Sequence, residues 1–246
     1  MPTLRSASNG SPHAVLLVAL SLCAGCSHVS PFRSIERSIR AELPQMIGPA
    51  DRYDVSVSRS GAGLIAGRIP WIEIHGHNVR AIQGLNLDDL TVRLEGVRFS
   101  RATRAVREIE QSRFEARVAA GSIVQSIHSR SPGLREVGVG ITRGEVRVHA
   151  APTLLGLGVP IEVDGRPVLR GPTAIDFEAS RVSVLRLGLP EFAVRRLEAR
   201  INPLADLATL SFPVRLSAVR VDGDRVVVEG TATLNPAQLQ APGGRR

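Results

Sequence analysis

Apolar and polar residues alternate with a period of two along most of the chain after residue 51, and this pattern predicts half-buried β-strands. The alternation begins at Val55 and Val57 and is clear in WIEIHGHNV, where Ile72 and Ile74 share one face. Later apolar positions in the same pattern are Val79, Leu85, Leu87, Leu90, Val92, Leu94, Val137, Val139, Ile141, Val146, Val148, Val159, Ile161, Val163, Ile175, Phe177, Val182 and Val184. Because the connections between these segments are short, we expect antiparallel meanders.

Glycine and aspartate mark the predicted turns between these strands. Thr142–Gly144, Asp164–Gly165 and Asp222–Gly223 each separate two apolar arms, and the last is the strongest hairpin signal in the chain. Asp88–Asp89 is also predicted at a turn, where aspartate favours backbone hydrogen bonds. At Gly96 the alternation shifts by one position, which predicts a β-bulge.

Helical spacing appears in three places. The segment PFRSIERSIRAELPQMIG carries an apolar stripe made of Phe32, Ile35, Ile39, Leu43 and Met46. Pro44 and Gly48–Pro49 predict its end. Such a helix either packs against the sheet or lies on a membrane, and packing is favoured because its polar face has few basic residues. Helical patterns return over residues 121–130 and 190–210.

The N-terminal segment has the order of an export signal: Arg5, an apolar run over residues 14–20, and then small residues. The apolar run is too short to span a membrane. Both cysteines lie here, as the pair Cys23 and Cys26, without the further ligands that a zinc site needs. The segment resembles a bacterial lipoprotein signal with the box Ala24–Gly25–Cys26, which implies cleavage before Cys26 and a lipid on its sulfur. A plain secretory signal is the alternative.

These features predict a signal peptide over residues 1–25, a tether over 26–33, a single domain over 34–236 and a disordered tail over 237–246. The chain from residue 27 onward contains no cysteine, so disulfides and thiol chemistry are excluded from the body.

The net charge of +8 raises the question of nucleic-acid binding. All 31 basic residues are arginine, and they are scattered along the predicted strands, as at Arg93, Arg98, Arg101, Arg147 and Arg220. Aromatic residues make up only 3% of the chain, so stacking platforms for bases are nearly absent. We therefore expect no nucleic-acid partner, although the charge favours anionic lipid head groups.

Catalytic and metal motifs are weak. His75 and His77 are two residues apart on a strand and share a face, but the sequence supplies no third ligand. The glycines of SGAGLIAGRI lack the Lys-Ser/Thr pair of a phosphate loop and are interpreted as a turn before a strand. The G-x-S-x-G elbow of serine hydrolases is missing from the sequence. We expect no catalytic residues, no cofactor and no metal.

Three segments resemble the LmeA-like phospholipid-binding family of bacterial envelope proteins: LIAGRIPWIEIHGHNVRAIQGLNLDDLTVRLEGVRFS, FEARVAAGSIVQSIHS and INPLADLATLSFPVRLSAVRVDGDRVVVEGTATL. The resemblance covers roughly residues 34–235. The positions that carry it are Gly67, Arg68, Gly84, Leu85, Asn202, Pro203 and Leu204.

The resemblance implies an α+β fold, in which a long, strongly curved antiparallel sheet wraps around helices, similar to tubular lipid-binding modules of the BPI and SMP type. It also implies residence in the cell envelope, no catalysis and an apolar cavity for acyl chains. The residues expected to line that cavity, chosen beside the family-like steps, are Leu85, Leu87, Leu204, Leu207 and Phe212.

Two functions of different classes remain open from the sequence. One is a membrane-anchored lipoprotein, facing the periplasm or cell exterior, that binds phospholipid or another acyl lipid for transport or envelope maintenance. The other is a structural or assembly lipoprotein that binds an envelope protein partner through a sheet edge or an arginine-rich face.

Overall fold

The structure is a computed structural model that describes the chain from Pro31 to Thr233, apart from short internal gaps. The described residues are 31–60, 63, 65–82, 85–100, 106–130, 134–142, 144–154, 157–184, 187–188, 190–192, 194–195, 202–210 and 212–233. Cys23, Cys26, Gly84, Arg101 and the predicted tail therefore lie outside the described residues.

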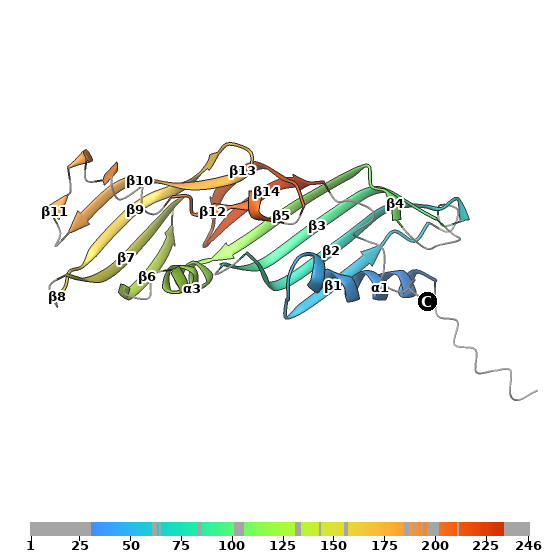
Figure 1. The fold of residues 1–246 in the computed structure, drawn as a ribbon, viewed down its shortest axis with the longest axis horizontal. Helices are drawn as coiled ribbons and strands as arrows, with labels where there is room; N and C mark the ends of the chain where they lie inside the picture. Colours follow the sequence, from blue (N-terminus) through green and yellow to red (C-terminus); the bar gives the residue numbers. More distant parts are fainter. Residues whose placement is uncertain are drawn as a thin grey trace, which may run out of the picture.

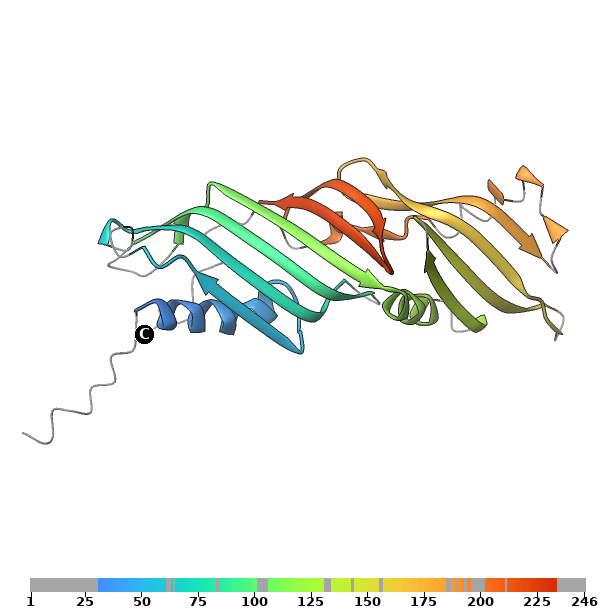
Figure 2. The ribbon, with the colours of Figure 1, turned by 180° about the vertical axis from the view of Figure 1, so that it is seen from behind.

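Two seven-stranded antiparallel sheets lie end to end along an elongated body (Figures 1 and 2). The first sheet has the order β1 (Arg52–Val57), β2 (Arg68–Ile82), β3 (Leu85–Phe99), β5 (Gln111–Ala119), β14 (Arg225–Ala232) and β13 (Val214–Asp222), with β4 (Val106–Glu108) on β3. The second has the order β11 (Leu187–Gly188), β10 (Ala174–Val184), β9 (Ile161–Arg170), β7 (Glu145–Leu154) and β6 (Leu134–Thr142), with β12 (Ala205–Asp206) on β10 and β8 (Leu157–Gly158) on β7. The predicted antiparallel meanders are confirmed.

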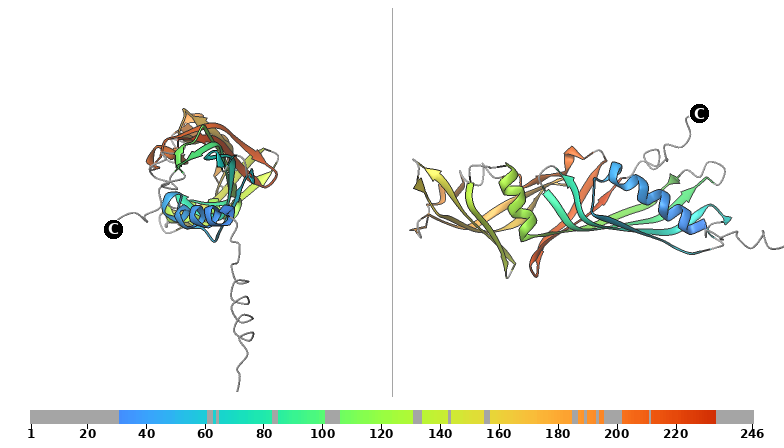
Figure 3. Two further views of the ribbon diagram at one scale, coloured as in Figure 1. Left: turned by 90° about the vertical axis from the view of Figure 1, so that its right-hand side faces the viewer. Right: turned by 90° about the horizontal axis from the view of Figure 1, so that it is seen from below.

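Helix α1 (Pro31–Met46) lies along β1 and packs its apolar stripe into the core of the first sheet. Leu43 is among the most buried side chains, and the Arg40 Nε–H donates to the Tyr53 carbonyl at 2.8 Å. Seen along the long axis, the sheet curls round and α1 lies across its open side (Figure 3, left). The prediction that this helix packs on the sheet is confirmed. It ends as expected before Gly48, whose φ of 141° suits glycine.

Glycines opposite aromatic rings accompany the curl of the sheets. Three rings lie over glycines of the neighbouring strand: Tyr53 over Gly76, Phe114 over Gly230 and Phe177 over Gly165. A Cβ atom on these glycines would come within 2.6–2.8 Å of ring atoms, so a side chain there would displace the ring. Such pairs are a known means of building curved sheets.

Several sequence-based predictions agree with the structure. Thr142 pairs with Glu145 at the end of the β6–β7 pair, and a turn at Asp222–Arg225 connects β13 to β14. Around Gly96, which has a φ of 65°, Leu94 and Val97 are both buried, so the apolar face changes there. The predicted β-bulge is wrong, because β3 keeps its register with β2 at this point and the registers of β3 shift elsewhere, opposite Val79–Ile82 and between Arg98 and Phe99. Helix α3 (Ala120–Arg130) occupies the predicted segment and packs beside β6 and β3.

Two predicted turns are wrong because distant partners hold the aspartates inside strands. Asp164 and Gly165 lie in the middle of β9, where Asp164 is buried and accepts a hydrogen bond from the Arg147 Nε–H at 2.6 Å. Asp88 and Asp89 lie within β3, and the Asp88 carboxylate accepts from the Ala119 N–H at 2.6 Å. In both cases the carboxylate binds a residue far along the chain instead of its own turn.

The helix predicted over residues 190–210 is only partly present among the described residues. Glu191–Phe192 and Val194–Arg195 are helical, but β12 and the short 3-10 helix η1 (Leu207–Thr209) follow after residue 202. The cause is Asn202, whose amide accepts from the Phe177 N–H at 2.7 Å and donates to the Phe177 carbonyl at 3.0 Å. This side chain extends the edge of β10 and fixes the segment in an extended conformation. None of the helices in the described residues is long and apolar enough to cross a membrane.

Candidate functional site

The second sheet has one apolar face and one polar face. Val139, Val148, Val163 and Val182 lie opposite one another on β6, β7, β9 and β10, and form one row of the apolar face. We name this the inner face, because it is continuous with the buried core. The opposite, outer face carries charged residues such as Arg147, which binds Glu162 and Asp164.

Burial of the inner face decreases with distance from the first sheet. The row nearest the middle of the molecule contains Ile141 and Val146, which are 7% and 4% exposed. In the next row Val182 is buried, while Val139, Val148 and Val163 are half-buried. In the last row that β7, β9 and β10 share, the apolar side chains Ala150, Ile161 and Val184 are only half-buried.

The apolar face of the first sheet is different, because it is covered. Ile72 and Val97 are 2% and 1% exposed, and Ile74, Leu90 and Leu94 are also buried. Helix α1 supplies part of this cover. The body therefore has a closed core at one end and, at the other, an apolar sheet face with partial access to solvent.

A comparison with protein-family models shows which family this chain belongs to. A family model described as LmeA-like phospholipid-binding matches residues 33–231. The chain belongs to the LmeA-like phospholipid-binding family. The resemblance found in the sequence is thus confirmed over nearly the same residues. Neither a curated protein nor a solved structure matches the chain.

The family-like positions of this LmeA-like protein serve the fold. Gly67, at a φ of 73°, precedes β2, and its carbonyl accepts from the Phe99 N–H at 3.0 Å. Asn202 binds the backbone of Phe177, and the Leu204 N–H donates to the Ile175 carbonyl at 2.8 Å. These contacts hold neighbouring strands together. The sequence motifs therefore specify the architecture and do not identify side chains that bind a ligand.

The five residues expected to line an acyl cavity all belong to the apolar core or pack against it. Leu87 and Leu207 are buried, and Leu85, Leu204 and Phe212 are half-buried beside the core. Their contact with lipid remains a prediction. Sequence reasoning did not single out the half-buried rows of the inner face as a site. Their period-two pattern was visible, but their incomplete burial depends on which elements cover them.

A cavity of about 140 Å³ lies near the end of the first sheet, where β2 begins and β3 ends. Its lining residues are Arg68, Ile69, Pro70, Gly96, Val97, Arg98 and Glu110. The volume is below the roughly 300–1,000 Å³ of typical ligand pockets. None of the predicted cavity residues lines it.

Many arginines of this LmeA-like protein form ion pairs on the outer faces of the sheets. Arg93 binds Glu73 at 3.1 Å and Glu95 at 2.9 Å, and Arg220 pairs with Glu229 across a hairpin. The Glu115 carboxylate beside Arg117 and the Asp164 carboxylate beside Arg147 raise the pKa of each guanidinium, chiefly through hydrogen bonds. Paired charges of this kind form a surface of mixed sign.

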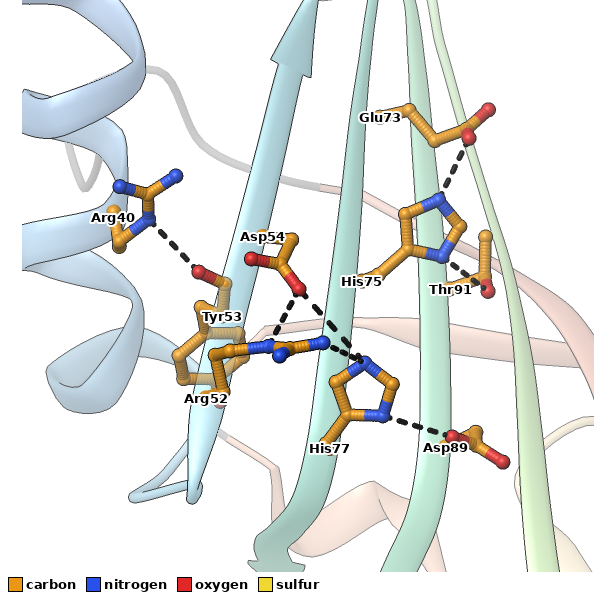
Figure 4. A network of polar contacts seen from close by, with 9 residues as sticks. All are labelled: Arg40, Arg52, Tyr53, Asp54, Glu73, His75, His77, Asp89 and Thr91. Carbon is orange, nitrogen blue, oxygen red and sulfur yellow. Dashed lines mark hydrogen bonds and ion pairs between the residues drawn. The ribbon is translucent and has the colours of Figure 1, made fainter.

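His75 and His77 share the outer face of the first sheet, as predicted (Figure 4). The His75 Nε2–H donates to Glu73 at 2.7 Å, and its Nδ1 lies 3.2 Å from the Thr91 hydroxyl. His77 contacts Asp89 through Nδ1 at 3.1 Å. Each ring thus has its own carboxylate partner. Within the described residues, no group of three or more potential ligands is arranged to hold a metal ion.

Proposed function

We propose that this chain is a non-catalytic cell-envelope lipoprotein that binds phospholipid, with the acyl chains along the inner face of the second sheet. The observation that carries the proposal is the gradient of burial from Ile141 and Val146 to Ile161 and Val184. An aliphatic surface that its own chain covers only in part is a suitable contact for hydrocarbon. Family membership names phospholipid as the class of ligand.

Burial of each CH₂ group contributes about 0.8 kcal/mol, so a long acyl chain supplies most of the affinity. We therefore expect selectivity to depend on chain length more than on head-group contacts. The half-buried residues are valines, isoleucines and alanines, which offer no hydrogen bonds to a head group.

The membrane attachment in this proposal is a lipid on the Cys26 sulfur. Four residues lie between Cys26 and Pro31, where α1 begins, and these five residue steps span at most about 18 Å when fully extended. The body would therefore stay close to the membrane that holds the anchor. From this position, we propose, the body transports or presents lipid in the envelope, as a tubular module of the BPI and SMP type would.

The test uses the body from residue 27 onward, which retains all described elements and the family match. Native mass spectrometry and solvent extraction should find phospholipid bound after purification. An empty body that takes up no lipid from vesicles would overturn the proposal. A stoichiometric protein partner without lipid would instead favour an assembly role through a sheet edge.

A matched pair of variants locates the site. Ile161→Asn changes the inner face, and Glu162→Asn changes the next residue of the same strand on the outer face. We expect the first to lower the bound lipid and the second to leave it unchanged. Equal lipid content in both variants would contradict the placement on the inner face.

A further inference from the structure

One end of the body gathers arginines that lack carboxylate partners. The start of α1, the end of β1, the start of β2 and the short strand β4 meet at this end (Figures 1 and 2). Five exposed arginines on or next to these elements form no ion pair with any described residue: Arg33, Arg37, Arg59, Arg68 and Arg107. We name these five residues the arginine end.

Strand pairing brings three of these arginines to neighbouring strand ends. Arg68 at the start of β2 lies opposite Arg98 on β3, and Arg98 lies opposite Glu108 on β4, the residue next to Arg107. Arg59 follows the end of β1 by two residues, on the side where β2 begins. Like charges directly opposite each other, as at Arg68 and Arg98, repel and favour an anion from outside the chain.

Helix α1 adds the other two arginines. It runs opposite to β1, and its residue Arg40 donates to the Tyr53 carbonyl near the start of β1 (Figures 1 and 2). Because an α-helix rises 1.5 Å per residue, Arg37 and Arg33 lie about 5 Å and about 10 Å closer to the arginine end than Arg40. Both side chains are exposed on the polar face of the helix.

Few carboxylates compete for these guanidinium groups. The described acidic residues near the arginine end are Glu36, Glu108 and Glu110, and the last two each lie 3.4 Å from Arg98. The sequence from residue 56 to residue 72, which contains Arg59 and Arg68, has no acidic residue at all. The positive charge of this end is therefore neutralised only in part by its own chain.

The arginines of the second sheet differ in this respect. Those that bind a carboxylate there are Arg147, Arg166 and Arg170. Other exposed arginines without an ion pair to a described residue, which include Arg113, Arg181 and Arg215, lie within β5, β10 and β13, away from the arginine end. These three provide a matched control for the charge of the arginine end.

We propose that the arginine end docks on the anionic phospholipid head groups of the membrane that holds the anchor. This inference rests on the membrane attachment in the proposed function. The five residue steps from Cys26 to Pro31 keep the start of α1 within about 18 Å of the lipid-bearing sulfur. Basic residues so close to an anionic surface are attracted to it, whereas those at the far end lie well beyond the Debye length of about 8 Å. Docking here directs the second sheet away from that membrane.

The experiment uses the body from residue 27 onward, which lacks the anchor, so that its affinity for vesicles reports on the protein surface. We expect flotation with vesicles of phosphatidylglycerol and phosphatidylcholine, weaker flotation as salt rises, and none with phosphatidylcholine alone. The triple variant Arg33→Gln, Arg59→Gln, Arg68→Gln should bind about fivefold more weakly for each arginine removed. The control Arg113→Gln, Arg181→Gln, Arg215→Gln removes the same charge and should bind nearly as the unchanged body does. Urea unfolding confirms that both variants fold.

A reporter shows which end touches the vesicles. The body has no cysteine, so Ile65→Cys near the arginine end and Phe192→Cys on the second-sheet side can each carry one environment-sensitive fluorophore. Ile65 and Phe192 are 72% and 71% exposed, so neither label disturbs the core. We expect anionic vesicles to change the emission at position 65 and to leave that at position 192 unchanged.

The outcomes separate this inference from the proposed function. Equal loss of binding in both triple variants, an emission change only at position 192, or a body that binds the soluble polyanion heparin but no vesicles would overturn the docking of the arginine end. Phospholipid extracted from the purified body is measured separately. Bound phospholipid without docking through these arginines would refute this inference alone, whereas docking by a body that holds and takes up no phospholipid would refute the proposed function alone.

Discussion

Tyr53 connects β1 to the segment that follows α1. Its ring covers Gly76 on β2, and its hydroxyl donates to the Gly48 carbonyl at 2.7 Å. Only 4% of the residue is exposed, and burial raises the pKa of Tyr53 to about 12. Since the chain has one tyrosine, its ionisation can be measured directly.

We predict that the ultraviolet absorbance of the folded protein titrates near pH 12, and that of the denatured chain near pH 10. Because folding favours the neutral phenol, this stabilisation is complete below pH 10 and is lost as pH rises toward 12. The loss amounts to about 2–3 kcal/mol of unfolding free energy. Tyr53→Phe should remove this part of the pH dependence. A folded protein that titrates near pH 10 would contradict the burial of this side chain.

Single side chains also explain where the turn predictions failed. Asp164 and Asp88 have the local sequence of turn residues, but Arg147 and the Ala119 N–H, 17 and 31 positions away, hold their carboxylates inside strands. At Asp222–Gly223 the local signal was correct, and Asp222 pairs with Arg225 across the hairpin. Local propensity identifies a turn only when no distant group binds the same residue.

At the scale of elements, Asn202 joins the segment before β12 to the edge of β10 with two hydrogen bonds to one residue. The Asn202 amide makes with Phe177 the two backbone hydrogen bonds that a neighbouring antiparallel strand would make. This contact fixes how the segment 202–210 runs beside the second sheet. The Leu207 N–H donates to the Thr173 carbonyl at 2.9 Å and continues the connection.

We predict that Asn202→Ala lowers the free energy of unfolding by about 1–3 kcal/mol, because it leaves the N–H and carbonyl of Phe177 without this partner. Asn86→Ala is the matched control, since its amide bonds Gln125 at an exposed position and should cost less than about 0.5 kcal/mol. Urea unfolding of both variants measures the difference. Equal midpoints would show that Asn202 does not stabilise the junction.

The sequence predicted most strands and two helices from their periods, but not the division into two sheets. The first sheet pairs β5 with β14, for example Ala116 with Val228, more than a hundred residues apart. Nothing in the local pattern near either strand indicates this pairing. Local pattern also failed to predict β12. The helical spacing of apolar residues continues to residue 210, but Asn202 and Pro203 interrupt the helix before β12.

At the scale of the whole molecule, the two ends differ in how their apolar surface is covered. Helix α1 closes the first sheet, whereas rows of the second sheet stay half-buried with increasing distance from the first sheet. The family resemblance predicted a lipid-binding fold from turn and strand-edge residues. It could not locate the site, because exposure of Val148 or Ile161 depends on the position of α1 and α3 relative to the two sheets.

The placement of acyl chains on the inner face can be tested most directly with a phospholipid that carries a photoreactive group at the end of one chain. Because all basic residues are arginine and Arg166 precedes a proline, trypsin releases one peptide from Val148 to Arg170, which spans the open rows. We predict that cross-links concentrate there and spare Ile69–Arg80 of the closed sheet. Label confined to Ile69–Arg80, or no cross-link to the body at all, would contradict the proposed site.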